Sequence, residues 1–295
     1  MDRYGRRSLG TAVVKAAGLV ACAVLWAAAT TAAVVAIPPT QDNTIADGID
    51  PGSGEDFTDN SSGACIYFFT GTTNDGFARR ALLRFDIAGN VPAGSSVNSV
   101  TLTLSMNRSG DNQDSTVTLH PLSRDWGEGT ADCGPKGGGQ GAPAGAGDAT
   151  WIDAEFGTTA WTTAGGDFGI SSGSALVGSA NGSLAVFSGA GMANDVQNWL
   201  DAPATNQGWI LVGEEGRSPT SRRYSSREGG LPPLLEIDIT PPPGSIACCF
   251  SDGLCSVELT GLDCTGVGGT PADPPTDSCS PNPCPQPVGA AVDVE

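Results

Sequence analysis

The residues from Arg80 to Met106 constrain the fold more than any other part of the chain. Apolar side chains occupy alternate positions over residues 81–87 and again over residues 100–106. Alternation with a period of two puts every second side chain on the same face of a strand, so it predicts two half-buried antiparallel strands. The link between the two runs contains residues typical of turns, namely Gly89, Pro92 and Gly94.

Shorter apolar patches indicate that most of the remaining chain is also sheet. Further strands are expected at 44–46, 64–70, 116–122, 174–177, 183–187, 209–212 and 234–239. One helix is expected over 193–200, because four apolar residues recur there at helical spacing: Met192, Val196, Trp199 and Leu200. Many short strands with one short helix are typical of an all-β fold, here an antiparallel β-sandwich or jelly roll.

The N-terminus has the pattern of an export signal. Basic residues between Arg3 and Lys15 precede a run of apolar and small residues over 16–36. This pattern predicts a signal peptide over residues 1–36 and a secreted or cell-surface location. The run approaches the roughly 20 residues needed to cross a bilayer, so an uncleaved membrane anchor is the alternative.

The charge of the chain limits its partners. After residue 36 it carries 10 basic and 31 acidic residues. Such a surface repels phosphate backbones, so nucleic acid is not an expected partner. The basic residues are almost all arginine, and they concentrate at 79–84 and 217–227.

The exported chain is expected to have two parts, which differ in their cysteine content. A domain over 37–240 ends at a Pro-rich linker over 241–246, which is followed by a Cys-rich module over 247–284 and a tail over 285–295. The module contains Cys248, Cys249, Cys255, Cys264, Cys279 and Cys284. Export favours disulfides, whose pairing the sequence leaves open. A zinc site is the alternative, although the module has no histidine and no pair of CxxC motifs.

The segment 127–149 is composed mainly of Gly, Ala and Pro. With so few apolar side chains it is expected to form a long mobile loop outside the core. The loop carries Cys133, and Cys65 lies in the expected strand at 64–70. We expect a disulfide that pins the loop to the sheet, with two unrelated thiols as the alternative.

Sugar recognition requires exposed aromatic rings and planar polar groups. Trp161 lies among Thr and Gly residues, so it is a candidate for an exposed stacking ring, with burial in the core as the alternative. A basic and aromatic cluster is the second candidate, and it comprises Arg222, Arg223, Tyr224 and Arg227. Its arginines can hold a carboxylate of an acidic polysaccharide, or they can pair internally with the carboxylates of the chain.

Acidic side chains near turns offer the oxygen ligands that a structural Ca²⁺ prefers. The candidates are Asp56, Asp59, Asp111 and Asp114, and ordinary turn chemistry is the alternative. No other cofactor is expected. Catalysis has little support, because the single histidine, His120, precedes Pro121 with no nucleophile motif nearby.

The alternating strand pair, RRALLRFDIAGNVPAGSSVNSVTLTL, resembles the R-x-x-L-x-F-D strand and the following strand of DNRLRE-domain proteins, which are also classed as carbohydrate-binding modules. Later landmarks over roughly residues 42–239 resemble those of the family in the same order: Trp126 with Glu128, Thr150-Trp151, Asp195-Val196 with Trp199-Leu200, Asn206 with Gly208-Trp209, and Tyr224 with Arg227-Glu228. The resemblance implies a secreted β-sandwich that binds polysaccharide in some members. The insertion at 127–149 departs from the family pattern.

The expected function is therefore non-catalytic binding of a polysaccharide or cell-surface glycan. A structural or adhesive cell-surface protein without a sugar ligand is the alternative. Glycan binding that depends on Trp161 or Arg227 favours the first function, and self-association without glycan binding favours the second.

Overall fold

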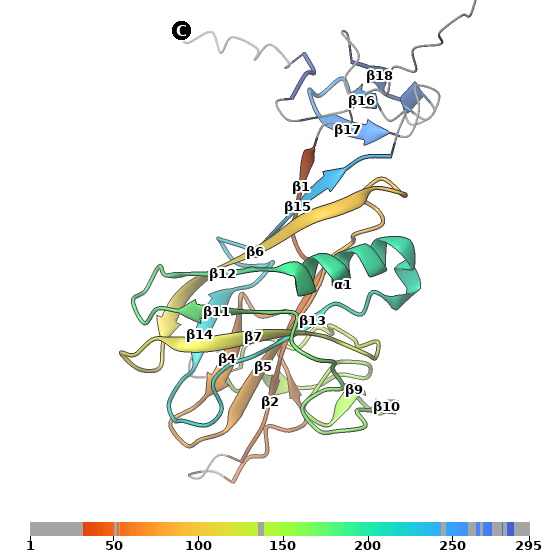
Figure 1. Cartoon of the computed structure of the whole chain (residues 1–295). Coiled ribbons are helices and arrows are strands. Elements are labelled where there is room, and N and C mark those ends of the chain that lie inside the picture. Colours follow the sequence, from red (N-terminus) through yellow and green to blue (C-terminus); the bar gives the residue numbers. More distant parts are fainter. Residues whose placement is uncertain are drawn as a thin grey trace, which may run out of the picture.

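The computed structural model describes residues 32–49, 52, 54–134, 139–242, 246–258, 264–265, 268–272, 279 and 282–285. Most of the expected signal peptide (1–31) and of the expected tail (286–295) lies outside the described residues. The described chain forms an antiparallel β domain with a small Cys-rich module at one end (Figure 1). The predicted all-β class is confirmed.

One curled sheet of 11 strands builds the domain. One half contains β1 (Ala33–Ile37), β15 (Leu234–Thr240), β6 (Ser96–Ser109) and β12 (Leu184–Ser188). The other half contains β2 (Gln41–Ala46), β5 (Ala78–Arg84), β13 (Trp209–Val212), β7 (Ser115–Pro121) and β11 (Gly173–Val177). The halves are joined by β14 (Arg222–Ser225), which pairs with β6, and by β4 (Tyr67–Thr72), which pairs with both β14 and β5.

The main hydrophobic core lies between the two halves of the sheet. Alternate residues of the two strands that dominate the sequence all face it, namely Ala81, Leu83, Phe85, Val100, Leu102, Leu104 and Met106. The alternation in the sequence therefore predicted the inward face of both strands correctly. Burial of this apolar area contributes roughly 25 cal/mol per Å² to stability.

The helix α1 (Ala190–Asp201) packs against β6. Its buried side chains are the four whose spacing predicted it: Met192, Val196, Trp199 and Leu200. The helix begins three residues earlier than expected, directly after Gly189. A short 3-10 helix, η1 (Pro203–Thr205), follows it.

A second hydrophobic cluster covers the outer face of β2, β5 and β13. Leu82 and Ile210 point away from the main core, and Trp126, Trp151 and Trp161 pack over them. The residues that cover this face include the short hairpin of β9 (Asp153–Glu155) and β10 (Thr159–Ala160).

The Gly-rich segment contributes to this second cluster. Ala149 is fully buried in it, and its N–H donates to the Gly127 carbonyl at 2.7 Å. The expectation that 127–149 lies outside the core is therefore wrong. Small side chains let the backbone itself approach the sheet closely, so hydrogen bonds replace the missing apolar side chains.

Four of the five residues of strand β1 lie within the expected signal peptide. Its five residues pair in regular register with β15, from Ala33 opposite Ile239 to Ile37 opposite Leu235. Ala33 and Ile37 are both buried in the main core. The first strand that the structure describes thus starts at Ala33, four residues before the expected domain boundary. In the part of the chain that the structure describes, no helix is long and apolar enough to cross a membrane.

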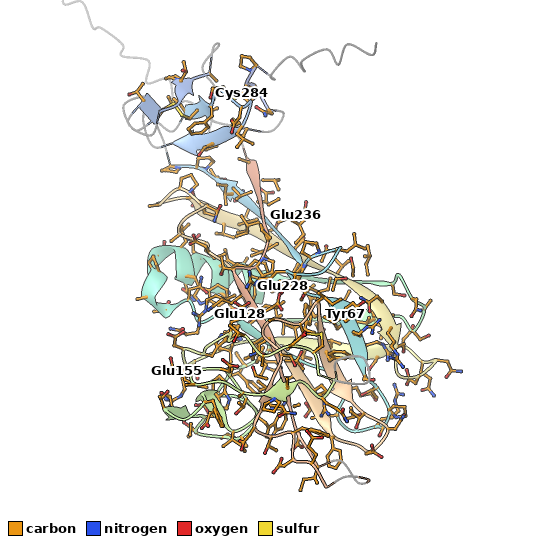
Figure 2. The ribbon with its side chains drawn as sticks, turned by 180° about the vertical axis from the view of Figure 1, so that it is seen from behind. Tyr67, Glu128, Glu155, Glu228, Glu236 and Cys284 are labelled. Atoms are coloured by element: carbon orange, nitrogen blue, oxygen red, sulfur yellow. A yellow bond between two sulfur atoms is a disulfide. The ribbon has the colours of Figure 1, made fainter. Side chains whose placement is uncertain are left out.

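The Cys-rich module contains a small sheet of β16 (Ile246–Cys249), β17 (Cys255–Glu258) and β18 (Thr270–Pro271). Three disulfides join its six cysteines: Cys248–Cys264, Cys249–Cys284 and Cys255–Cys279. These disulfides leave none of the six thiols for zinc. Figure 2 shows Cys284 in this module, at the end of the molecule away from Glu155.

Candidate functional site

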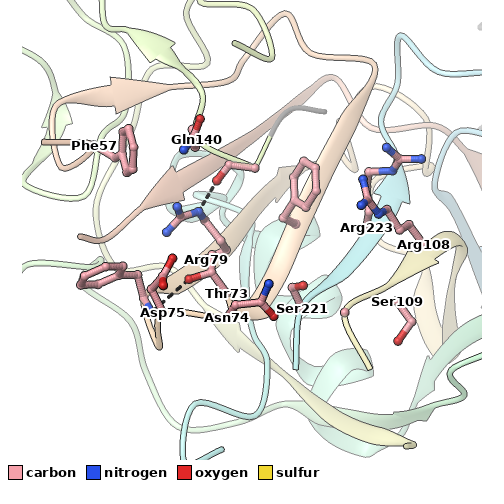
Figure 3. A pocket seen from close by; sticks show the side chains of 14 residues that line it. Phe57, Thr73, Asn74, Asp75, Arg79, Arg108, Ser109, Gln140, Ser221 and Arg223 are labelled. Atoms are coloured by element: carbon pink, nitrogen blue, oxygen red, sulfur yellow. Dashed lines mark hydrogen bonds between the residues drawn. The ribbon is translucent and has the colours of Figure 1, made fainter. Parts of the chain in front are cut away.

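A pocket of about 360 Å³ opens where β4, β5, β6 and β14 come together (Figure 3). Its lining combines three arginines, three phenylalanines and a set of small polar side chains. We call it the arginine pocket, after Arg79, Arg108 and Arg223.

Three strands bring the arginines of the pocket together. Arg79 lies on β5, Arg108 on β6 and Arg223 on β14. Arg108 and Arg223 are direct partners in the antiparallel register of β6 and β14. Figure 3 shows these two side chains next to each other at one side of the pocket.

The arginines of the pocket differ from the others in that no carboxylate among the described residues forms an ion pair with them. Six of the nine described arginines form ion pairs: Arg80, Arg84, Arg124, Arg217, Arg222 and Arg227. The structure shows no ion pair for the remaining three, Arg79, Arg108 and Arg223. Three such arginines line one pocket together with a single carboxylate, that of Asp75, so the pocket concentrates positive charge in a chain with an excess of carboxylates.

Arg79 is the most deeply buried of the three arginines in the pocket. It is 2% exposed, and its guanidinium donates to the backbone carbonyls of Asp47, Ala78 and Gly139. Burial lowers its pKa to about 10, while the Asp47 carboxylate acts in the opposite direction at longer range. Arg79 remains charged at neutral pH, held by neutral acceptors.

Arg223 is fixed in place by stacking. Its guanidinium carbon lies 3.9 Å from the centre of the Tyr67 ring, and its Nε donates to Asn107 Oδ1 at 2.6 Å. Partial burial lowers its pKa, and the charge of Arg108 adds to this effect. A planar guanidinium held in this way has donors ready for a carboxylate or sulfate.

The remaining lining combines aromatic and polar side chains. Its aromatic rings are Phe57, Phe69 and Phe77. Hydroxyl, amide and carboxylate groups complete it, from Thr73, Asn74, Asp75, Ser109, Gln140 and Ser221. Phe57 and Phe69 are 3% and 7% exposed, so only the half-buried Phe77 offers part of its ring to the C–H face of a pyranose. The polar groups can bond the hydroxyls of a sugar.

The structure corrects the expectation for Trp161. Its ring is 5% exposed, and its Nε1 donates to the Thr150 carbonyl at 2.9 Å. Trp161 is therefore a core residue of the second cluster, not an exposed platform. The Thr and Gly residues around it in sequence gave no sign of the apolar outer face of β5 and β13 that it covers.

Two residues of the predicted basic and aromatic cluster are also buried. Arg222 is 0% exposed and pairs with Asp111 at 3.1 Å, so it pairs internally. Tyr224 is fully buried and stacks on Phe68, and burial strongly raises the pKa of its hydroxyl. Only Arg223 of the predicted cluster lines the arginine pocket.

Arg227 lies outside this pocket, in a carboxylate-rich turn. Its guanidinium binds Glu128 in a bidentate pair at 2.7 and 2.9 Å and also contacts Glu228 at 2.9 Å. The hydrogen bond with Glu128 raises the pKa of Arg227. Arg227 and Arg223 do not share a strand face, because β14 ends at Ser225.

Asp42 lies beneath this turn. It is 0% exposed, and its carboxyl accepts the Arg227 N–H at 2.7 Å. Burial raises the pKa of Asp42 to about 8, and the neighbouring Glu228 and Glu128 add to the rise, while the Arg227 N–H opposes it. Figure 2 shows where the two glutamates lie.

The four candidate calcium ligands are not brought together. Asp111 binds Arg217 and Arg222, and Asp56 accepts the Thr58 N–H and hydroxyl at 2.9 and 2.7 Å. These contacts of Asp56 are ordinary turn chemistry. Among the residues that the structure describes, which include Asp59 and Asp114, no three His, Cys, Asp or Glu side chains are placed to hold a metal ion.

His120 makes two local contacts. Its Nδ1 lies 3.0 Å from the Gly169 carbonyl oxygen, and its Nε2 lies 3.0 Å from Thr118 Oγ1. Its ring packs edge to face on Phe168. In this arrangement the described structure places neither a serine nor a carboxylate on the ring nitrogens.

Sequence reasoning missed Arg79 and Arg108 as site residues. One available signal was the concentration of basic residues at 79–84, but Arg79, Arg80 and Arg84 have different environments. No protein-family model matches the chain, and no curated protein matches it.

Proposed function

We propose that this chain is a secreted, non-catalytic module that binds an acidic polysaccharide or cell-surface glycan in the arginine pocket. The observation that carries the proposal is that the three described arginines without a carboxylate partner all line the same pocket. The motif resemblance to DNRLRE-domain carbohydrate-binding proteins is consistent with it, and no protein-family model matches the chain.

The chemistry of the pocket favours a charged sugar over a neutral one. Arg108 and Arg223 present guanidinium donors side by side, which suits the two oxygens of a uronate carboxylate or a sulfate ester. Each charge-assisted hydrogen bond contributes about 1.5–3 kcal/mol. The half-buried Phe77 ring then contacts the apolar face of the same sugar.

The acidic surface restricts where such a ligand can bind. Overall negative charge repels a polyanion and slows its approach, so binding requires a local positive site. The proposal therefore predicts that contact is confined to the arginine pocket and its rim.

Affinity gel electrophoresis tests this function. The chain is run through gels that contain a polyuronate, the same polymer after reduction of its carboxyl groups, or a sulfated polysaccharide, each with and without Ca²⁺. We expect retardation by at least one of the two charged polymers and none by the reduced one. Equal retardation by the charged and reduced polyuronate, or none by any polymer, would contradict the proposal.

A structural or adhesive role is the second candidate, and strand β1 favours it. This strand, AVVAI, is uncharged and pairs only with β15 in the described structure. An uncharged edge strand is a template for pairing with another chain. Concentration-dependent self-association in sedimentation equilibrium, together with no glycan retardation, would support this role.

A further inference from the structure

The Gly-rich insertion forms part of the arginine pocket. Gly139 and Gln140 line the pocket, and Figure 3 shows Gln140 on the side of the pocket where Arg79 and Phe57 lie. The Gly139 carbonyl accepts the Arg79 Nε–H, so the insertion also fixes the deepest arginine. The segment that departs from the family pattern therefore contributes directly to the site.

We call Gly139 and Gln140 the wall of the pocket. Two short segments of the insertion, which we call arms, connect this wall to the body of the domain: residues 131–134 form the first arm and residues 141–143 the second. In the first arm, the Ala131 carbonyl accepts the Ala64 N–H at 2.8 Å, and Cys133 forms a disulfide with Cys65. In the second arm, β8 (Ala142–Pro143) pairs with β3 (Asn60–Ser61). Asn60 Nδ2 also donates to the Gln140 carbonyl at 2.9 Å.

The two arms are in direct backbone contact. A Cβ added to Gly134 would lie 1.8 Å from the Gly141 carbonyl oxygen, a distance that only a glycine avoids. Gly134 also has a φ of 69°, which other residues rarely adopt. The position of the second arm, which carries the wall, therefore depends on the position of the first.

The wall has no apolar anchor of its own. Residues 139–143 read Gly-Gln-Gly-Ala-Pro, and none of them belongs to either hydrophobic cluster. A segment without buried apolar side chains depends on a few hydrogen bonds and covalent constraints for its order. Here the covalent constraint is the disulfide, and Cys65 is fully buried at its other end.

From these contacts we infer that Cys65 and Cys133 are positioning residues for the ligand site: their disulfide holds the Gly139–Gln140 wall, and affinity for the acidic glycan depends on it. The inference rests on the proposed function for its ligand. The structural part, that the disulfide orders the wall, stands separately.

The double variant Cys65→Ala/Cys133→Ala tests the structural part by hydrogen exchange. We expect amide exchange in 139–142 to accelerate at least tenfold, with exchange in the core strands β5 and β6 little changed. The matched control is Cys248→Ala/Cys264→Ala, which removes a disulfide of the Cys-rich module and should leave 139–142 unaffected. Unchanged exchange in the first variant overturns the inference, even if no glycan binds.

Affinity for a polyuronate oligosaccharide tests the functional part. We expect at least a tenfold loss in the first double variant and wild-type affinity in the control. If wild type binds and the first variant binds equally well, the inference fails while the proposed function stands. If wild type does not bind the oligosaccharide or a sulfated one, the proposed function fails instead.

A second variant covers the possibility that the double cysteine variant does not fold. Gly134→Ala keeps both cysteines and presses a methyl group against the Gly141 carbonyl. It should also weaken binding and accelerate exchange in 139–142. Wild-type affinity and exchange in Gly134→Ala would overturn the coupling between the arms.

Discussion

Arg108 and Arg223 lie directly opposite each other on β6 and β14, and the structure shows no carboxylate paired with either. Like charges at directly opposed positions of an antiparallel pair destabilise the sheet. Arg223 retains its place by stacking on Tyr67, and Arg108 is exposed to solvent. This arrangement is unfavourable for folding alone, which is one reason for the proposed role of the two arginines in ligand binding.

The substitution Arg108→Gln should therefore stabilise the protein in the absence of ligand. We expect the free energy of unfolding to rise by about 0.2–1 kcal/mol, because the like-charge repulsion disappears. Urea unfolding at low ionic strength measures this change. The control Arg124→Gln removes a partner of Asp167 and should give no gain. A loss of stability in Arg108→Gln would show that this side chain has a structural role.

Trp161 should matter for stability and not for binding. Trp161→Ala removes a buried ring from the second cluster, and such changes reduce the free energy of unfolding by about 3–5 kcal/mol. Trp161→Phe should lose less and retain full affinity for the glycan. If Trp161→Phe folds normally but loses binding, the ring takes part in recognition after all.

Asp42 should make the protein less stable as pH rises. Its folded pKa of about 8 lies above the unfolded value of about 3.9, so the folded state holds a proton that the unfolded state releases. The contribution of this group is fully present below about pH 4 and is lost as the pH rises to about 8, with a slope of at most about 1.4 kcal/mol per pH unit.

Thermal unfolding across pH 4–9 measures the effect, and Asp42→Asn provides the comparison. The amide oxygen of Asn can still accept the Arg227 N–H. The charged groups that face Asp42, namely Arg227, Glu128 and Glu228, are unchanged in this variant. A stability profile with the same slope in the variant would assign the pH dependence to those groups instead.

Removal of β1 should destabilise the domain. A chain that starts at Pro38 loses the pairing with β15 and the burial of Ala33 and Ile37, whereas a chain that starts at Ala33 keeps both. Burial of the Ile37 side chain alone contributes about 1.5–3 kcal/mol. A lower Tm is therefore expected for the shorter chain, and equal values would show that β1 is dispensable.

The position of β1 also predicts where any signal peptide is cut. Cleavage after Ala36 would remove four of the five strand residues, so we expect the mature N-terminus at or before Ala33. Mass spectrometry of the exported protein gives this position directly. A mature chain that starts at Ile37 or later would contradict the role of β1.

The sequence predicted most of the main core, since the expected strands and the helix there follow a clear periodicity. It missed β1, which was assigned to the signal peptide, and β14, which was not among the expected strands. It did not predict the second cluster, which requires strands that are apolar on both faces. The signal for it was present in consecutive apolar runs such as Leu82-Leu83 and Trp209–Val212, which are typical of strands covered on both sides.

The site was harder to predict than the fold. Arg79, Arg108 and Arg223 are distant in sequence and meet only because β14 inserts between β4 and β6. Whether an arginine has a carboxylate partner depends on the same long-range pairing. Arg222 and Arg223 are neighbours in sequence, yet Arg222 is neutralised by Asp111 and Arg223 lines the pocket.

The most direct test is calorimetric titration of a polyuronate oligosaccharide into wild type, Arg108→Gln/Arg223→Gln and Arg124→Gln, with a sulfated oligosaccharide in parallel. We predict that wild type and Arg124→Gln bind one of these ligands with equal affinity. The double variant should lose at least about tenfold for each arginine removed, given 1.5–3 kcal/mol per charge-assisted hydrogen bond. Equal affinity of the double variant and the Arg124→Gln control would contradict the assignment of the arginine pocket as the ligand site.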